Sequence, residues 1–319
     1  MCVILFIIYG TGVVFKMGES KVKTVCVLMS TYNGEKYLRE QIDSIINQVN
    51  VKVILFVRDD GSADSTCSIL KEYKNENKLE YVCGRNVGYV NSFMTMLRDA
   101  SEADYYALSD QDDIWDKDKL SIAVSALEKC NDAALYCSNA RLVDEKLDFI
   151  KNENKRPKIS FGSSLVKNFA TGCTMVFNND LKRKVCASNP DYISSHDSWI
   201  CRVCFAVGGT VIFDDVPHIS YRQHGSNVVG SNASNIAKIK NRFMKLKNDN
   251  SHSRKRSAEE LIRNYKHEMS TQNQKLAGLI LNYDRSFGEL IAVASSSEFS
   301  CGRTMDDIFF RVALLLKWV

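Results

Sequence analysis

The sequence contains little proline, with three residues in 319, and no long uninterrupted apolar run. So few prolines exclude a Pro-rich linker or stalk, because such segments depend on repeated proline to stay extended. The most apolar stretch, residues 1–15, is shorter than the ~20 residues that a membrane-spanning helix needs. It also lacks the basic start and the small-residue cleavage site of a signal peptide. The domain pattern begins near Val22, after Met17, so residues 1–20 are expected to be an extension: either a start assigned too far upstream or a leader that touches a membrane.

Cysteine is plentiful, but its spacing does not form a disulfide framework. The eleven cysteines are odd in number and scattered along the chain, which predicts a reducing and therefore cytoplasmic environment. Cys201 and Cys204 have the C-x-x-C spacing of zinc sites, yet no second Cys or His pair stands nearby. Their apolar neighbours Trp199 and Phe205 favour a buried helix face instead.

The formal net charge is only +4, but it is unevenly distributed. Residues 236–275 hold eleven Lys/Arg against four Asp/Glu, a balance of +7, which leaves −3 for the rest of the chain. A local basic stretch is either a solvated helix face or a contact for an anionic partner. The chain has no recognised nucleic-acid motif, so no nucleic acid is expected. Together with the apolar residues 309–318, the basic stretch predicts peripheral contact with a membrane surface.

Apolar periodicity predicts four consecutive strand–loop–helix units. Short runs, of which 22–29 is β-branched and apolar, predict strands at 22–29, 51–57, 79–82 and 105–108, with helices expected at 37–47, 65–74, 91–100 and 117–129. Each of these strands ends in a polar cluster, and ligands of open α/β sheets bind outside the carboxyl ends of the strands. The sequence therefore predicts an α/β domain over residues 21–230, with a mostly parallel sheet flanked by helices. A basic, helical C-terminal extension is expected over residues 231–319.

The strongest acidic cluster follows the fourth predicted strand. Residues 110–113 read Asp-Gln-Asp-Asp, which places three carboxylates within four positions. Such crowding raises carboxylate pKa values unless a cation compensates it, and oxygen ligands suit Mg²⁺ or Mn²⁺. The alternative is a solvated acidic turn that caps the helix expected from residue 117. An EF-hand loop is excluded, because its sixth position is Trp115 rather than Gly and its twelfth is Ser121 rather than Glu.

Several polar clusters in register resemble a known enzyme family. Ser30-Thr31-Tyr32-Asn33-Gly34, Asp59-Asp60-Gly61-Ser62-x-Asp64, Asn86-x-Gly88 and the 110–113 cluster resemble, in order and spacing, the family 2 glycosyltransferases. The resemblance covers residues 22–230 and implies the GT-A fold, a nucleotide-binding α/β domain. Residues 221–227, Tyr-Arg-Gln-His-Gly-Ser-Asn, are similar to a segment of bacterial rhamnosyltransferases and related polysaccharide enzymes.

The resemblance also implies roles for individual residues. The nucleotide would be bound by Thr31, Tyr32, Asn33, Asp60, Arg85, Asn86 and Asp110. The metal would be held by Asp112 and His224, and the pyrophosphate would be covered by Arg222. The acceptor would be bound by Thr171, Gly172, His196 and Trp199. The catalytic base would be Asp197; many relatives carry Glu-Asp at this point, so His196 is a departure while the second acid is retained.

The implied activity is an inverting, metal-dependent sugar transfer in cell-surface polysaccharide synthesis. The best candidate donor is dTDP-L-rhamnose, and the acceptor would be a glycan or a lipid-linked glycan at the inner face of the plasma membrane. A UDP-hexose donor and a non-catalytic nucleotide-sugar-binding module remain alternatives. A nucleotidyltransferase would need a Gly-rich basic loop near the first strand, which the sequence lacks. An Asp-nucleophile phosphatase would carry its D-x-D on the first strand, not the fourth.

Overall fold

The computed structural model describes residues 8–9, 12–13, 22–224, 252–302, 304–317 and 319. The strands are β1 (Ile8–Tyr9), β2 (Gly12–Val13), β3 (Thr24–Thr31), β4 (Lys52–Asp59), β5 (Glu80–Cys83), β6 (Tyr105–Ser109), β7 (Ile114–Trp115), β8 (Ala134–Ser138), β9 (Arg141–Val143), β10 (Phe149–Asn152), β11 (Val176–Asn178), β12 (Thr210–Asp214) and β13 (Ile219–Arg222). The helices are α1 (Leu38–Ile46), α2 (Thr66–Asn75), α3 (Tyr89–Asp99), α4 (Lys119–Leu127), α5 (Phe161–Val166), α6 (Asn179–Ala187), α7 (His196–Ala206), α9 (Ser253–Tyr265), α10 (Thr271–Asn282), α11 (Phe287–Ser295) and α12 (Thr304–Leu315), with 3-10 turns η1 (Gly172–Thr174) and η2 (Ser297–Phe299).

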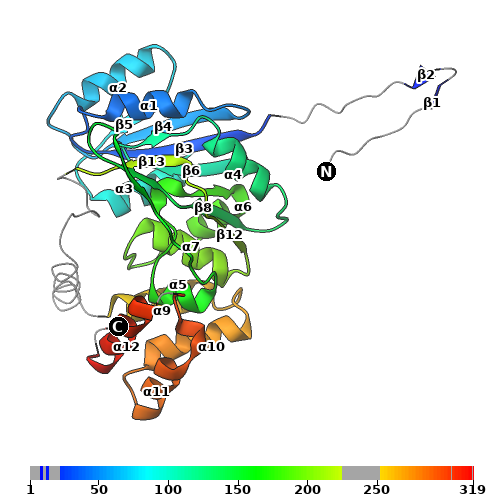
Figure 1. Cartoon of the computed structure of the whole chain (residues 1–319), viewed down its shortest axis with the longest axis vertical. Helices are drawn as coiled ribbons and strands as arrows, with labels where there is room; N and C mark the ends of the chain where they lie inside the picture. The colour runs from blue at the N-terminus through cyan, green and yellow to red at the C-terminus, as the bar shows by residue number, and fades with distance from the viewer. Residues whose placement is uncertain (1–7, 10–11, 14–21, 225–251, 303, 318) are drawn as a thin grey trace.

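A seven-stranded sheet organises the molecule, with the order β12-β8-β11-β6-β3-β4-β5 (Figure 1). The strands β3, β4, β5 and β6 pair in parallel, as expected from the alternation of strands and helices along the chain. Only β11 runs antiparallel to its neighbours in this sheet, β6 and β8. Because β3 to β6 all point the same way, their polar end-loops lie at one edge of the sheet, as the sequence predicts.

Both faces of the sheet are buried, and successive residues of β3 supply them alternately. Val25 and Val27 pack with α1, α2 and α4 on one side. Cys26 and Leu28 pack with α3, α6 and α7 on the other. This period-two alternation with no exposed face explains why the strand is an unbroken apolar run in the sequence.

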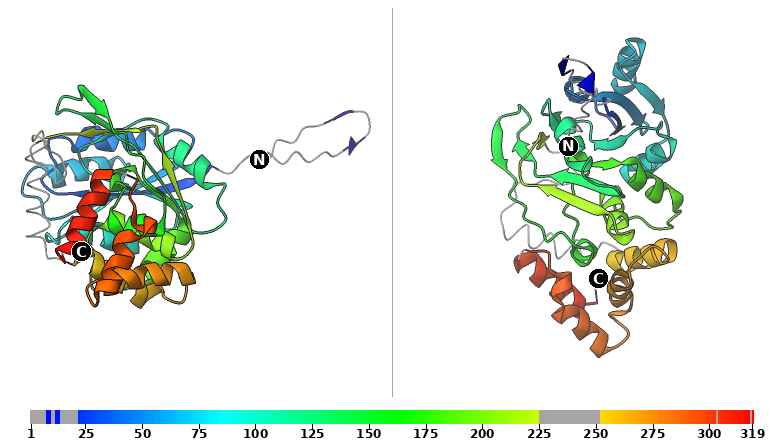
Figure 2. Two further views of the ribbon diagram at one scale, coloured as in Figure 1. Left: turned by 60° about the horizontal axis from the view of Figure 1, so that its bottom comes forward. Right: turned by 90° about the vertical axis from the view of Figure 1, so that its right-hand side faces the viewer.

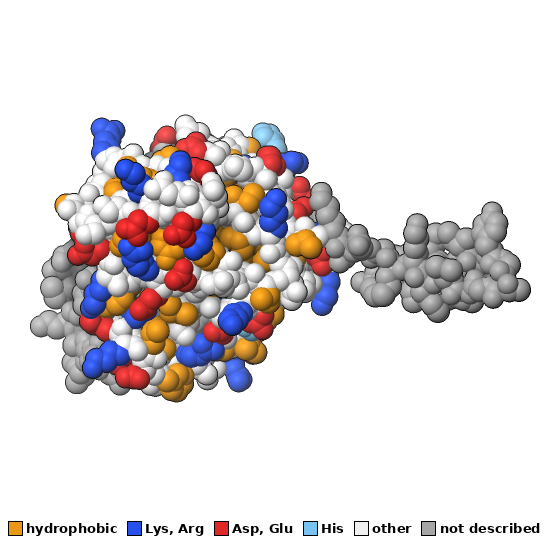
Figure 3. All heavy atoms as spheres, turned by 90° about the horizontal axis from the view of Figure 1, so that it is seen from above, with side chains coloured by type: hydrophobic (Ala, Val, Ile, Leu, Met, Phe, Trp, Pro, Cys, Tyr) orange, Lys and Arg blue, Asp and Glu red, His pale blue; other side chains and the backbone are white. Residues whose placement is uncertain are grey.

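The outer surface of α1 and α2 is solvated and carries charges of both signs. Charged side chains are interspersed on this face, which lies at the top of Figure 1 and is seen in Figure 3. They include the ion pairs Arg39–Glu72, at 2.6 Å, and Lys74–Glu80, at 2.7 Å. Exposed pairs of this kind contribute little stability, so the layer is held by its apolar inner face.

A second sheet, which the sequence pattern does not predict, lies beside the first. Its order is β10-β9-β13-β7, and it pairs β13 with β7 across Ile219↔Trp115 and Ser220↔Ile114. Strands of two to four residues are too short to show a periodicity, and β13 pairs with β7 about a hundred positions away along the chain. The sheet holds Arg222, at the end of β13, against the loop after β6.

The C-terminal helices form a layer at the lower end of the molecule (Figures 1 and 2). The helix α9 packs on α7, and its Ala258, Leu261 and Tyr265 belong to the same buried core as the sheet. Residues 236–251 of the predicted basic stretch lie outside the described residues, as does most of the predicted extension 1–20. None of the helices that the structure describes combines the length and apolarity needed to cross a bilayer.

Candidate functional site

The site is built from loops at the carboxyl edge of the sheet, and hydrogen bonds join these loops directly. The loop after β3 meets the loop after β4 where Asn33 N donates to Ser62 Oγ at 2.8 Å and Asn33 Oδ1 accepts from Ala63 N at 2.9 Å. Asn33 adopts a left-handed φ of 49°, which asparagine tolerates better than most residues. The predicted convergence of the polar clusters is thus confirmed.

Gln111 links the acidic cluster to the loop after β3. Its Oε1 accepts from Thr31 Oγ1 at 2.6 Å and from Tyr32 N at 2.8 Å. Gly34 makes this approach possible, since a Cβ there would lie 2.4 Å from Gln111 Oε1. The family resemblance implies no individual role for Gln111, although its place between Asp110 and Asp112 indicates one.

Asp60 organises the loop that follows β5. Its carboxylate accepts from Val87 N at 3.0 Å and from Gly88 N at 2.9 Å, and it pairs with the Arg58 guanidinium. The side chain is 3% exposed, so most of its hydrogen-bonding capacity is already used inside the protein. Its contact with a nucleoside therefore stays a prediction.

Five of the predicted nucleotide-binding residues lie on these loops, and they differ in how exposed they are. Tyr32, Asn33, Arg85 and Asn86 are exposed on the connected loops, where a ligand can reach them. Thr31 is 1% exposed and is occupied with Gln111. Thr31 therefore holds the loop in place, and its contact with the nucleotide stays a prediction.

Three carboxylates influence one another at the end of β6. Burial, together with the charges of Asp112 and Asp197, raises the pKa of Asp110 to about 7. Asp197 reaches this point from the first turn of α7. Residues more than eighty positions apart in the sequence are therefore brought to one acidic centre. Such a centre favours a cation, because positive charge relieves the repulsion that holds the pKa of Asp110 high.

The two predicted metal ligands lie side by side. His224 Nε2 is 2.6 Å from Asp112 Oδ2, and the imidazole ring lies 5.2 Å from the ring of Tyr37. An imidazole nitrogen and a carboxylate oxygen at this separation can both turn to one divalent ion, and both atom types suit Mn²⁺. The residues present thus fit a metal of the predicted kind.

Asp113 and Lys119 are buried behind the acidic cluster. Asp113 Oδ1 accepts from Arg222 N at 3.2 Å, while Oδ2 has no partner among the described residues. Burial raises the pKa of Asp113, and Cys173 Sγ lies within 4.8 Å of a carboxylate oxygen of both Asp113 and Asp110. Burial also lowers the pKa of Lys119 to about 7, and its Nζ lies 3.4 Å from the centroid of the Trp115 ring. Both groups therefore favour their neutral forms, and Asp113 supports the site from inside.

Arg222 does not lie open to a pyrophosphate, and that prediction is corrected. Its side chain is 2% exposed and stacks on Tyr37, with 4.3 Å from Cζ to the ring centroid. Its Nε donates to Asp112 O at 2.9 Å, its Nη1 donates to Glu145 O at 2.7 Å, and its Nη2 pairs with Glu40. Arg222 therefore positions the backbone of the metal loop. Its burial depends on the β7–β13 pairing, which no local pattern reveals.

The predicted acceptor side is formed by η1 and the first turn of α7. A Cβ on Gly172 would lie 2.8 Å from His196 Nε2 and 3.6 Å from Asp197 Cβ, so these elements are in close contact. His196 is stacked on Phe93 at 4.1 Å, and burial lowers its pKa, which favours the neutral imidazole. Thr171 is half-buried and accepts a hydrogen bond from Lys155 Nζ at 2.7 Å.

Trp199 is a core residue, so the prediction that it contacts the acceptor is wrong. The side chain is 1% exposed and lies 6.1 Å from the ring of Tyr265 in α9. Cys201 and Cys204 are buried on the same helix, as expected for a structural C-x-x-C. This helix face joins the sheet layer to the C-terminal helices.

Comparison with known proteins places this arrangement among sugar-transferring enzymes. Residues 26–185 match the model "Glycosyl transferase family 2". The chain is 30% identical over 230 residues to "dTDP-rhamnosyl transferase RfbG" of Shigella flexneri, covering 66% of this chain and 77% of the relative. It is 28% identical over 48% of its length, and 58% of the relative's, to "UDP-Glc:alpha-D-GlcNAc-diphosphoundecaprenol beta-1,3-glucosyltransferase WfgD" of Escherichia coli.

Solved structures share the fold at low sequence identity. The structure of S. aureus TarS 1-349 in complex with UDP-GlcNAc matches with a TM-score of 0.58 at 15% identity, over 93% of this chain and 82% of that one. GalNAc-T7 with UDP, GalNAc and Mn²⁺ matches with a TM-score of 0.52 at 11% identity, over 67% of this chain and 46% of that one. The mixed, mostly parallel sheet and these likenesses confirm the predicted GT-A fold.

Proposed function

This chain belongs to glycosyl transferase family 2, and we propose from that premise that it is an inverting, metal-dependent glycosyltransferase. It takes a sugar from a nucleotide-sugar donor and transfers it to a glycan or lipid-linked acceptor in cell-surface polysaccharide synthesis. The observation that carries the proposal is the meeting of Asp110 and Asp112 with Asp197, whose charges raise the pKa of Asp110. A binding module needs the first two acids but has no use for a third on the acceptor side.

The proposed chemistry assigns one proton and two bonds. Asp197 takes the proton of the acceptor hydroxyl while that oxygen forms a bond to the anomeric carbon from the side opposite the leaving group. The bond from that carbon to the diphosphate oxygen breaks, so the configuration inverts. When a divalent cation is bound, Asp112 and His224 hold it, and it supplies positive charge for the leaving nucleoside diphosphate. Arg222 keeps Asp112 in place through the backbone carbonyl.

Asp197→Asn tests the base. General-base catalysis contributes typically about 10²–10⁴-fold, so transfer should fall by that factor while nucleotide binding is retained. Asp180→Asn is the matched control, because Asp180 also lies in the first turn of a helix, α6, and has the same effect on a helix dipole. Near-wild-type transfer by Asp197→Asn would remove the proposed base. If the wild-type protein and both variants all show only background transfer, the non-catalytic binding module is favoured instead.

The donor is proposed to be dTDP-L-rhamnose, with a UDP-hexose as the alternative. The first is supported by the name of the Shigella flexneri relative and the second by the names of the Escherichia coli relative and of TarS. A panel of dTDP- and UDP-sugars, each with Mn²⁺ or Mg²⁺, should raise the melting temperature selectively for the true donor. Stabilisation by UDP-sugars alone would overturn the rhamnose assignment.

Peripheral membrane contact at the inner face of the plasma membrane is proposed to bring the enzyme to a lipid-linked acceptor. The supporting surface lies on α11 and α12, where Phe287 is 78% exposed and Ile308 50% exposed. Deleting these helices would remove the core residues Val293 and Phe310, so point substitutions are the better test. Phe287→Ser with Ile308→Ser should reduce co-sedimentation with phosphatidylglycerol vesicles. Phe149→Ser, which removes a 63% exposed aromatic on β10, should not; equal sedimentation of all variants contradicts the idea.

A further inference from the structure

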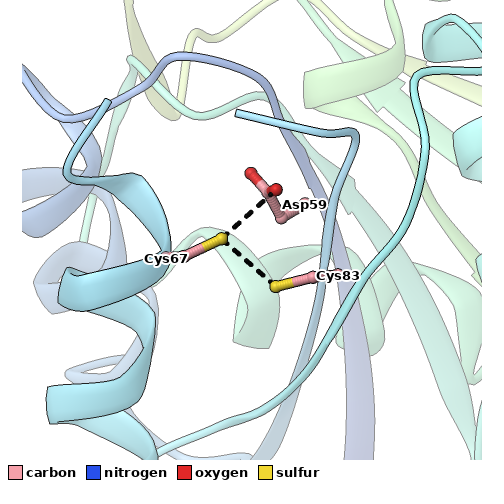
Figure 4. Close-up of side chains that lie close together, drawn as sticks. All are labelled: Asp59, Cys67 and Cys83. Carbon is pink, nitrogen blue, oxygen red and sulfur yellow. Dashed lines mark hydrogen bonds between the residues drawn. The ribbon is translucent and has the colours of Figure 1, made fainter. Parts of the chain in front are cut away.

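Two cysteine thiols face each other beside the loops that carry the predicted nucleoside contacts. Cys67 lies in the first turn of α2 and Cys83 is the last residue of β5. Their Sγ atoms are 3.2 Å apart, and Figure 4 shows both side chains pointing toward one another. A disulfide bond is about 2.0 Å long, so closing the gap needs a movement of about 1.2 Å.

The two thiols differ in accessibility in the way that a reactive pair requires. Cys83 is exposed, so a small oxidant in solution can reach it. Cys67 is half-buried, and burial together with its hydrogen bond to Cys83 raises its pKa to about 12. Cys83 is therefore the thiol that reacts first, and Cys67 is the one that completes the bond.

Asp59 connects the thiol pair to the rest of the site. It is the strand partner of Cys83 in the β4–β5 pairing, and its Oδ2 accepts from Cys67 Sγ at 3.4 Å. The same oxygen accepts from Gly61 N at 3.2 Å and from Ser62 N at 3.0 Å. Ser62 Oγ in turn accepts a hydrogen bond from Asn33 N. A change at the thiols can therefore be passed to the loop after β4 and to the loop after β3.

A metal ion is a weaker use of the same three side chains. Asp59, Cys67 and Cys83 have ligand atoms within 4.8 Å of one another. However, the carboxylate of Asp59 is 1% exposed and already holds the turn after β4 through the backbone of Gly61 and Ser62. A metal would have to compete with those bonds for the Asp59 oxygens, whereas a disulfide needs no ligand from Asp59.

We propose that Cys67 and Cys83 are a redox-modification site, at which a low-molecular-weight disulfide converts them to an intrachain disulfide and thereby weakens donor binding. The Cys83 thiolate attacks the small disulfide, RSSR, forming a mixed disulfide and releasing one thiolate RS⁻. Cys67 then gives up its proton, for which Asp59 Oδ2 is the nearest acceptor, and attacks Cys83 Sγ to release the second RS⁻. In total, two protein thiols lose two hydrogens and RSSR becomes two RSH. Reversible disulfides of this type are the usual kind in a reducing compartment.

The new bond acts on binding by moving the chain next to Cys83. Gly84 follows directly and is tied to Asp59 O through its N–H at 2.9 Å. The exposed predicted nucleoside residues Arg85 and Asn86 come next, so a shift of about 1 Å at Cys83 is passed to them. Misplacement of a substrate-positioning group by about 1 Å can cost up to about 10²-fold. We expect the dissociation constant of the nucleotide to rise at least roughly threefold on the same reasoning. This effect on donor binding rests on the proposed function, while the disulfide itself does not.

The test uses the full chain, first reduced and then equilibrated with oxidised glutathione. Peptide mapping by mass spectrometry should find a Cys67–Cys83 linked peptide, and calorimetry should find weaker binding of dTDP or UDP as probes. Dithiothreitol should reverse both changes. Cys83→Ser should form no link and should keep its probe affinity under oxidant. Cys130→Ser is the matched control, since it removes another half-buried thiol outside the pair and should behave like wild type.

Two results overturn the proposal. One is oxidised wild-type protein in which Cys67 and Cys83 stay free or carry only glutathione; the other is a linked peptide with unchanged probe affinity. If reduced wild-type protein binds neither dTDP nor UDP, the proposed donor function fails. In that case the peptide map still decides whether the modification site exists.

Discussion

Replacing Arg222 with methionine should destabilise the protein and loosen the metal loop together. Methionine fills a similar volume but has no donors, so Asp112 O and Glu145 O lose their hydrogen bonds, which are 2.9 and 2.7 Å long. Stacking on Tyr37 would change from a cation–π contact at 4.3 Å to an apolar one. The perturbation therefore removes specific interactions without opening a large cavity.

The size of the loss follows from the number and setting of those interactions. Hydrogen bonds to charged groups contribute about 1.5–3 kcal/mol each, and the cation–π contact about 1 kcal/mol. Removing a buried guanidinium also recovers part of its desolvation cost. We expect a net loss of about 2–4 kcal/mol in the free energy of unfolding. The Glu40 carboxylate is 54% exposed, so its pair with Arg222 should contribute less than about 1 kcal/mol.

Urea unfolding followed by tryptophan fluorescence measures this loss, because Trp115 lies on β7 next to β13. Glu40→Gln is the matched control for the ion pair, and Arg222→Lys separates charge from the forked geometry. Manganese affinity should fall by about 10–100-fold in Arg222→Met, the usual effect of removing a group that orients a metal ligand. A loss below about 1 kcal/mol, or an equal loss in Glu40→Gln, would refute the assigned role of the backbone carbonyls.

Three further predictions concern the metal, the acceptor side and pH. Asp112→Asn should lower both the Mn²⁺ affinity and the transfer rate by roughly 10²-fold or more, measured by titrating the rate with metal. Retention of both would exclude Asp112 as a metal ligand. Gly172→Ala should cost about 1–3 kcal/mol by overpacking, because its Cβ would meet His196 Nε2 at 2.8 Å. The same variant should lower transfer more than nucleotide binding, through displacement of Asp197, and equal losses would count against the proposed acceptor side. Burial raises the folded-state pKa of Asp110 from 3.8 to about 7, so the metal-free protein holds a proton there that the unfolded chain releases. Its stabilising effect is complete below the unfolded pKa and is lost as pH rises through about 7, so urea midpoints without metal should fall from about pH 5 to about pH 8. Asp110→Asn should flatten that fall, and a wild-type midpoint that rises over this range would show the sign to be wrong.

The parallel half of the fold is predictable because its information is local. Each of the strands β3 to β6 is a short apolar run that ends in a polar cluster, and each is followed by a segment with helical spacing. Parallel order then brings the clusters to one edge without further knowledge. Asp110 and Asp112 were found for this reason, and the structure differs from the expected strand limits by at most two residues at each end.

The antiparallel parts carry no such local pattern. The strand β11 is three residues long and inserts between β6 and β8, more than thirty positions from either in sequence. The burial of Arg222 depends likewise on β13 meeting β7. A resemblance in sequence letters marked Arg222 as functional, but only the pairing shows that it acts through the backbone.

The mistake at Trp199 was avoidable from the sequence. Residues two positions apart on a helix do not face the same side. With Asp197 directed to the acidic centre, Trp199 had to point toward the core, where the apolar Val203 also lies.

The amide of Gln111 has a thermodynamic consequence for the order of events. Its oxygen accepts hydrogen bonds from Thr31 and Tyr32, which lie on the loop that a nucleoside is proposed to contact. Its neighbours in the chain, Asp110 and Asp112, are the acids proposed to contact the ribose and the metal. When the nucleotide orders the loop after β3, the loop after β6 that binds the metal is ordered as well, and the reverse also holds. The second ligand to bind therefore costs the protein less conformational entropy than the first. Linkage makes the benefit reciprocal: the factor by which the cation tightens the nucleotide must equal the factor by which the nucleotide tightens the cation. In Gln111→Ala, both affinity factors should fall toward one, because the hydrogen bonds that connect the two loops would be lost.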